Sequence, residues 1–165
     1  MIYFFDTSAL QHRYIDGSKS RGIRWTISSA RNEVYIADLS ILEIASAIAK
    51  HCRTERLSVA RYERIDRAFW QDIRQGKVLV RKTTQRDYLR ARHLIRYAGV
   101  EKKKHIGSSD ALIAASCLAF ALESNSSVKF CLEDWTLFHI IRDISAFSRV
   151  LDFRFIGVDK SKANP

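Results

Sequence analysis

Short apolar runs alternate along the chain with longer segments whose apolar residues recur every three or four positions. The short runs are rich in Val, Ile, Phe and Tyr, which favour β-strands. Several are apolar on both faces, as strands inside a parallel sheet are. The runs predict five strands, over Ile2–Phe5, Val34–Ala37, Lys77–Val80, Val128–Leu132 and Phe153–Val158.

The segments between these runs have the apolar spacing of helices. The polar segment Gly17–Ser29 lacks a clear pattern, and we interpret it as a loop or a frayed helix. The segment after Ala111 is apolar on all sides, which indicates a central, buried helix. Helices are predicted from Ser40 to about Arg53, from Ser58, near Gln85–Ala98, over about Asp110–Glu123 and after Asp134.

This alternation of strands and helices predicts an α/β fold, with one central parallel sheet of about five strands sandwiched by helices. A length of 165 residues corresponds to a single domain.

Composition adds a basic surface to this picture. The chain has 28 Lys and Arg against 18 Asp and Glu, a net charge of +10. Such a charge attracts RNA, DNA, acidic proteins or anionic membranes, although a basic surface without any nucleic-acid role explains it equally well. Three widely spaced cysteines indicate reduced thiols and a cytoplasmic protein. No apolar run is long enough to cross a membrane, and the first residues do not resemble a signal peptide.

Four acidic residues fall where predicted strands end and helices begin. Asp6 directly follows the first strand, Glu43 lies in the first turn of a helix, Asp110 begins the apolar helix, and Asp134 follows the fourth strand. Because ligands of parallel sheets bind at the carboxyl ends of the strands, we expect these acids to converge there. A divalent cation such as Mg²⁺ or Mn²⁺ would relieve their mutual repulsion. An acidic metal pocket on a basic protein is the pattern of a nuclease.

Each acid also has a purely structural interpretation. Asp6, Asp110 and Asp134 are plausible helix N-caps. Glu43 fits a capping box, Ser40-Ile41-Leu42-Glu43. Asp6 is the strongest functional candidate, because a charge at the end of the run Ile-Tyr-Phe-Phe is costly unless something pairs with it.

Much of the positive charge lies in residues 81–105, which include nine Lys and Arg. Arg86, Arg90, His93 and Tyr97 share one face of a predicted helix, and Lys102–Lys104 follow it. We interpret this segment as a candidate track for a phosphate backbone beside the acidic pocket. The alternative is a solvated helix face.

These residues resemble a known family. The segment Ile2–Leu10 resembles the opening strand and the D-T-S-A-L motif of PIN domains, and Gly107–Ala115 resembles their D-A-L-h-A-A block. Ser40–Ile48 resembles the second helix of the family, and Phe130–Leu137 resembles the strand that ends in its fourth acid. The resemblance covers residues 1–159, which are identified as a PIN-like nuclease domain, and leaves a short C-terminal tail over residues 160–165.

The resemblance implies a Mg²⁺- or Mn²⁺-dependent endoribonuclease that hydrolyses single-stranded RNA. It implies that Asp6 and Asp110 are the main metal ligands and that Glu43 and Asp134 complete the site, directly or through water. A metal-bound hydroxide would then attack phosphorus and expel a 3′-hydroxyl. The segment Leu-Glu-Asp-Trp departs from the Thr or Ser that often precedes the fourth acid, so the sequence leaves open whether Glu133 shares the role of Asp134.

Single PIN domains of this size resemble VapC-type toxins of toxin–antitoxin pairs. The resemblance therefore also implies a cognate antitoxin protein as partner and a homodimer.

Two other classes compete with this interpretation. The first is a non-catalytic RNA- or partner-binding module on the same fold, which the loss of two acids would favour, yet all four are present. The second is a phosphatase or phospho-acceptor domain. A haloacid-dehalogenase-type start requires D-x-D, but Thr7 and Ser8 follow Asp6, and a receiver domain requires paired acids ahead of its acceptor strand.

Overall fold

The computed structural model describes residues 1–15, 20–144, 147, 149 and 151–155, and all structural statements concern these residues. They form an α/β fold around one five-stranded sheet, in which the strand order is β3-β2-β1-β4-β5 and every pair is parallel. The predicted fold class is thereby confirmed. The strands are β1 (Ile2–Phe5), β2 (Glu33–Ala37), β3 (Leu79–Arg81), β4 (Val128–Leu132) and β5 (Leu151–Phe155).

The predicted strands differ from the observed ones mainly at the sheet edges. β1 and β4 have the predicted bounds, and β2 begins one residue early. β3 begins at Leu79 rather than Lys77, because the backbone N–H groups of Lys77 and Val78 both donate to the Asp72 carbonyl and complete the turn after the preceding helix. β5 begins at Leu151 rather than Phe153, and its predicted end, residues 156–158, lies outside the described residues, as does the predicted tail over residues 160–165.

The five predicted helices occur in the predicted order, and two more, Thr7–Leu10 and Ser20–Ser28, precede them. Part of the segment interpreted as a loop or frayed helix is a regular helix, Ser20–Ser28, because Ile23, Thr26 and Ile27 lie on one side of it and are buried. Residues 17–19 of that segment lie outside the described ranges. The helices are α1 (Thr7–Leu10), α2 (Ser20–Ser28), α3 (Leu39–Thr54), α4 (Val59–Arg74), α5 (Gln85–Arg96), α6 (Ser108–Ser124) and α7 (Trp135–Arg142).

Local capping sets where the helices begin. Ser58 caps α4 as predicted, since its hydroxyl accepts the Arg61 N–H. α3 begins at Leu39 rather than Ser40, because Asp38 is its N-cap and accepts the Leu39 N–H. A short 3₁₀ turn, Gln11–Arg13, follows α1, and a π-helical turn, Tyr97–Glu101, follows α5.

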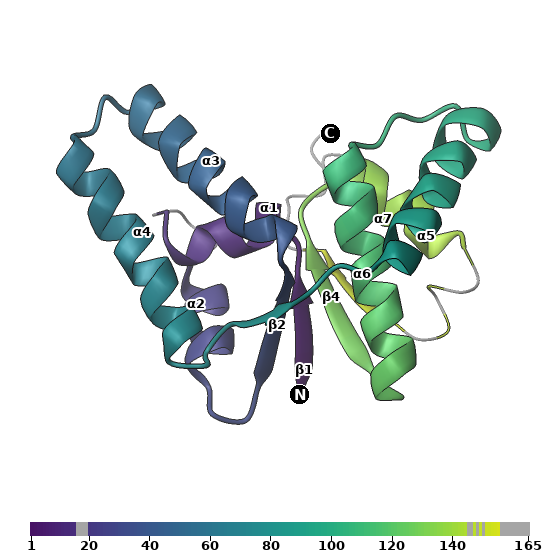
Figure 1. Ribbon diagram of the computed structural model, residues 1–165, viewed down its shortest axis with the longest axis horizontal. Helices are drawn as coiled ribbons and strands as arrows, with labels where there is room; N and C mark the ends of the chain where they lie inside the picture. Colours follow the sequence, from purple (N-terminus) through teal and green to yellow (C-terminus); the bar gives the residue numbers. More distant parts are fainter. Residues whose placement is uncertain (16–19, 145–146, 148, 150, 156–165) are drawn as a thin grey trace, which may run out of the picture.

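Two helical layers cover the two faces of the sheet, α1–α4 on one side and α5–α7 on the other (Figure 1). The central strand β1 serves both cores. Phe4 packs in the core that includes Phe130 and the apolar helix α6, whereas Tyr3 and Phe5 pack in the core beneath α3 and α4. Burial on both faces explains why β1 reads as a continuous apolar run.

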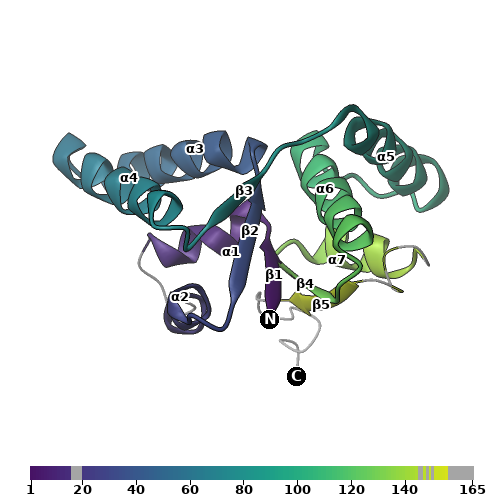
Figure 2. The same cartoon turned by 60° about the horizontal axis from the view of Figure 1, so that its bottom comes forward.

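The parallel arrangement places the carboxyl ends of all strands at one edge of the sheet. In Figure 1 this edge lies opposite the N-terminus, which is at the foot of β1, and Figure 2 shows β2, β1, β4 and β5 following one another across the sheet. The pairing of β1 with β4 continues one residue beyond the strand, because the Asp6 N–H donates to the Cys131 carbonyl at 2.9 Å. The site therefore begins directly where the central strand stops.

The structure bears on two predictions about the chain as a whole. Cys52, Cys117 and Cys131 are buried, as predicted, and none of them forms a disulfide in the described part of the chain. Among the helices of the described ranges, none is long and apolar enough to cross a membrane.

A buried ion-pair network ties β3 to the α5–α6 layer. Asp87 is fully buried and accepts from Arg81 Nη1 at 2.8 Å and from the Thr84 N–H at 2.8 Å. Burial alone would raise the Asp87 pKa, but the hydrogen bonds from Arg81 and Thr84 outweigh it and lower the pKa. Arg81 also donates to the buried Ser116 hydroxyl and to Glu123 at the surface. The network fixes the start of α5 against α6.

We expect Asp87→Ala to destabilise the fold by about 3 kcal/mol, because it leaves the Arg81 guanidinium without its buried partner. The matched control is Glu123→Ala, which removes an exposed partner of the same guanidinium and should cost less than about 1 kcal/mol. Urea unfolding measures both changes. Equal losses for the two variants would contradict the role given to Asp87.

Candidate metal and nuclease site

A pocket of about 620 Å³ opens at the carboxyl edge of the sheet. Its walls come from the chain that follows β1, from one face of α3 and from the first turn of α6. Three of the four predicted site residues line it: Asp6, Glu43 and Asp110.

Asp6 lies at the floor of this pocket with only 2% of its surface exposed. It is the N-cap of α1, because one carboxylate oxygen, Oδ2, accepts the Ser8 N–H at 3.3 Å and also the Ser8 hydroxyl. The other oxygen, Oδ1, is buried and has no hydrogen-bond partner among the described residues. The role as N-cap therefore explains the position of Oδ2, but it gives no reason for burying Oδ1.

The electrostatic surroundings of Asp6 disfavour its charged form. Burial raises its pKa from 3.8 to about 7. The hydrogen bonds from Ser8 oppose this shift, and the negative charges of Asp110 and Glu43 add to it. Asp6 is thus a carboxyl group that would hold a proton near neutral pH unless a cation joins it.

Glu43 faces Asp6 from the first turns of α3. Its Oε2 accepts the hydroxyl of Thr7 at 2.6 Å, which links α3 to α1. The capping-box interpretation of this residue is wrong, because Asp38 caps α3 and the Ser40 hydroxyl is buried without a partner among the described residues. The side chain of Glu43 is directed to the pocket instead of to its own helix end.

Asp110 is not an N-cap either. α6 begins at Ser108 with Gly107 as N-cap, and the Gly107 N–H lies close enough to the Asp110 carboxylate to lower its pKa. Burial raises the Asp110 pKa, and the charges of Glu43 and Asp134 raise it further, against the effects of the Gly107 N–H and of His105. Gly107 is required for space, since a Cβ at this position would lie 2.6 Å from Asp110 Oδ2.

Asp134 has a different position from the other three acids. It caps α7, where its Oδ1 accepts the Leu137 N–H at 2.8 Å, and it does not line the pocket. It is close enough to Asp110 to raise the pKa of that carboxyl. The structure therefore brings Asp6, Glu43 and Asp110 together and leaves Asp134 at the margin, next to Asp110.

These acids are neighbours but do not form a closed ligand cage. Among the described residues, no group of three or more His, Cys, Asp or Glu side chains is arranged to hold a metal ion. Mg²⁺ does not require such a cage, because it commonly binds through one or two carboxylates, keeps several waters and gains further ligands from substrate phosphates. The unpartnered Asp6 Oδ1 and the oxygen-only donor set fit this mode of binding.

A second chain of contacts joins α1 to the end of β4. The Glu133 N–H donates to the Ser8 hydroxyl at 3.2 Å, and the Glu133 carboxylate lies 2.8 Å from His12 Nε2. Ser8 in turn donates to Asp6. Through these contacts Ser8 holds the Asp6 carboxylate against β4, while Glu133 pairs with His12 rather than with the other acids.

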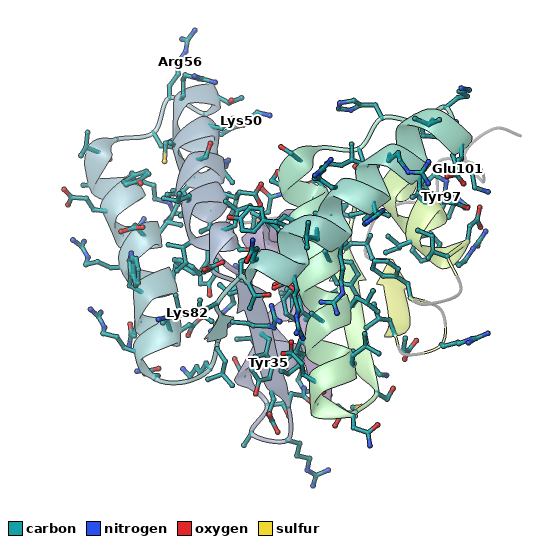
Figure 3. All side chains as sticks on the ribbon, turned by 45° about the vertical axis from the view of Figure 1, so that its right-hand side comes forward. Tyr35, Lys50, Arg56, Lys82, Tyr97 and Glu101 are labelled. Atoms are coloured by element: carbon teal, nitrogen blue, oxygen red, sulfur yellow. The ribbon has the colours of Figure 1, made fainter. Side chains whose placement is uncertain are left out.

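The cations of the pocket differ from those expected from the sequence. None of Arg86, Arg90, His93 and Tyr97 lines it; the last three border a separate pocket between α5, α6 and the segment after α7. The cationic or potentially cationic residues that line the acidic pocket are His12, Lys50 and His51. Figure 3 shows Lys50 on α3, well apart from Tyr97.

Helical spacing was the signal available for these missed residues. Lys50 is seven positions after Glu43, which is two turns along the same face of α3. His12 is four positions after Ser8. Extending the helical face of Glu43 leads to Lys50, and extending that of Ser8 leads to His12.

Comparison with solved structures identifies the fold. VapBC-1 from nontypeable Haemophilus influenzae matches with a TM-score of 0.60 and 18% identity, over 94% of this chain and 98% of the other. VapBC2 from Rickettsia felis, bound to a promoter DNA fragment, gives 0.59 and 16%, over 93% and 98%. FitAcB from Neisseria gonorrhoeae gives 0.58 and 18%, over 85% and 92%.

Sequence comparison carries the family assignment. No match was found among curated proteins. The family model described as "PIN domain" matches residues 3–128, which include β1 and the acidic positions 6, 43 and 110. The chain belongs to the PIN domain family.

Proposed function

We propose that this protein is a Mg²⁺- or Mn²⁺-dependent endoribonuclease that hydrolyses phosphodiester bonds of single-stranded RNA. We further propose that it is the VapC-type toxin of a toxin–antitoxin pair. The family assignment and the VapBC and FitAcB neighbours support this proposal at the level of the fold. The chemistry rests on the site residues.

The observation that carries the proposal is the contrast among three buried aspartates. Asp72 is paired with Arg13 at 2.9 Å, and Asp87 with Arg81 at 2.8 Å. Asp6 is buried as deeply but is surrounded by other acids, and one of its oxygens has no partner among the described residues. An unpaired buried carboxylate costs stability. A divalent cation supplied from solution would remove that cost.

The residues of the pocket then have distinct roles. When bound, the metal ion polarises the phosphodiester and lowers the pKa of a coordinated water. Asp6 and Asp110 would hold the ion, and Glu43, fixed by Thr7, would complete the site directly or through water. Ser8 keeps the Asp6 carboxylate oriented, and Asp134 adds negative charge beside Asp110. The net charge of +10 favours association with a polyanion.

The partner follows from the toxin assignment. The two similar structures described as VapBC suggest an antitoxin chain bound to this fold, and we propose a cognate antitoxin for this protein, together with a homodimeric state. A non-catalytic binding module on the same fold is less well supported, because such a module gains nothing from burying Asp6 among other acids.

We expect Asp6→Asn to reduce Mg²⁺-dependent cleavage of single-stranded RNA by roughly 100-fold or more, because it removes a charged ligand from the floor of the pocket. Cleavage of labelled oligonucleotides, with and without EDTA, measures the effect. Asp66→Asn on α4 makes the same chemical change outside the pocket and should leave the rate unchanged. Metal-dependent cleavage that survives in Asp6→Asn would refute the proposed site.

The raised Asp6 pKa also predicts a dependence of stability on pH in the absence of metal. Between pH 4 and 7 the folded protein keeps a proton on Asp6 that the unfolded chain has lost. The free energy of unfolding should therefore decrease as the pH rises through this window, by up to about 4 kcal/mol from this group.

Urea unfolding in EDTA, at about pH 4.5 and at about pH 8, measures this change in the free energy of unfolding. Asp6→Asn should lose less stability than the wild type between them, because the amide does not ionise. Addition of Mg²⁺ at the higher pH should restore stability to the wild type only. Parallel losses in both proteins would show that Asp6 is not the responsible group.

A further inference from the structure

One wall of the pocket is a single face of α3. Glu43, Ser46, Ala47, Lys50 and His51 all line the pocket from this helix. Glu43 lies near the start of the helix, the small side chains follow, and Lys50 comes after them, with Thr54 and Glu55 lining the pocket beyond it. Along this wall a positive charge therefore lies between the acids at the floor and Glu55 at the rim.

Lys50 is a cation without a partner on this wall. It is exposed, and within the described part of the chain no carboxylate lies within 4.0 Å of its ammonium, Glu55 at the pocket rim included. Its helical neighbours three and four positions away are Ser46, Ala47, Arg53 and Thr54, so α3 itself offers no acid to neutralise it.

We propose that Lys50 binds an RNA phosphate next to the one that is cut, and so directs the substrate strand along α3. This inference rests on the proposed nuclease function and adds to it a path for the substrate. The ammonium of lysine is a flexible point charge suited to a phosphate contact. Without a bound polyanion, the same ammonium would remain solvated and without any role in the pocket.

The spacing on the helix explains why the contact is to a neighbouring phosphate. Seven residues separate Glu43 from Lys50, which corresponds to a rise of roughly 10 Å along α3. The scissile phosphate must lie near the carboxylates Asp6, Glu43 and Asp110 at the floor. Lys50, about two helical turns from Glu43, would contact the RNA at a phosphate beyond the one that is cut. The small side chains of Ser46 and Ala47 leave room for the RNA between Glu43 and Lys50.

This path differs from the candidate phosphate track of residues 81–105. On α5, Arg90 lies 3.4 Å from the buried Asp87, and Arg96 pairs with Glu101 at 2.9 Å. Both cations are therefore partly neutralised within the protein. Lys50 is the better candidate for binding a phosphate near the acids, because it lines the acidic pocket and has no ion-pair partner among the described residues.

The first experiment measures binding rather than cleavage. Fluorescence anisotropy of a labelled single-stranded RNA 20-mer of mixed sequence is recorded in EDTA at several salt concentrations. We expect Lys50→Ala to weaken binding roughly fivefold and to lower the slope of log K against log salt by about 0.7, the loss of one phosphate contact. Lys50→Arg should retain both.

Arg31 provides the matched control. It is an exposed cation before β2, outside the pocket and outside the candidate phosphate track. Arg31→Ala removes the same charge and should leave affinity and salt slope close to the wild-type values. An unchanged slope in Lys50→Ala, or equal losses in Lys50→Ala and Arg31→Ala, would overturn the inference, since Lys50 would then contribute only to the overall positive charge of the protein.

A second experiment locates the phosphate. Neutral methylphosphonate groups replace single phosphates on either side of the cleavage position mapped in that oligonucleotide. At one flanking position the substitution should slow cleavage by the wild type severalfold and have no further effect on Lys50→Ala. Additive effects at every flanking position would refute the proposed contact. A wild type that neither binds nor cleaves RNA would instead refute the proposed function, so the two failures are distinguishable.

Discussion

The cost of removing one carboxyl group from water governs the organisation of this protein. β1 is buried on both faces and lies at the centre of the sheet, so the residue that follows it cannot reach solvent easily. Asp6 occupies this position, and burial raises its pKa to about 7. Two other buried aspartates, Asp72 and Asp87, are each paired with an arginine that offsets the cost of burying their charge. At the end of β1 the fold supplies two more acids instead, which makes a cation from solution the natural counter-charge.

The surrounding contacts keep this arrangement in place without neutralising it. The Thr7 hydroxyl donates to Glu43, the Ser8 hydroxyl donates to one oxygen of Asp6, and the Gly107 N–H faces Asp110. Each of these donors is uncharged. They orient the carboxylates without neutralising the negative charge of the pocket, as the proposed metal site requires.

The sequence was sufficient for the fold and for most of the acidic residues, because both depend on local patterns. β1 and β4 were predicted to the residue from their apolar runs, and Asp6 from its place after β1. The errors concern contacts between distant segments. Ser40 and Glu43 fit a capping box, but Asp38 precedes them and caps α3, while Thr7 binds Glu43 from another helix.

The candidate phosphate track, which includes residues 86–97, stays a prediction, and its position relative to the acids could not be derived from the sequence. Periodicity shows that residues share a helical face, but it does not show which part of the fold that face meets. Arg90, His93 and Tyr97 face α6 and the segment after α7, and not the acids. No sequence motif includes Lys50, and only the structure shows that it lines the same pocket as the acids.

Gly107 shows that a residue without a side chain can shape a cluster of acids. Its backbone dihedrals are ordinary, so any amino acid could adopt them, and what it provides is empty volume beside Asp110. A methyl group there would displace the carboxylate although the acid itself is still encoded. Relatives that retain every acid but carry a larger residue at this position would therefore look intact in an alignment and still have a deformed centre, so an inventory of acidic residues alone would misclassify them.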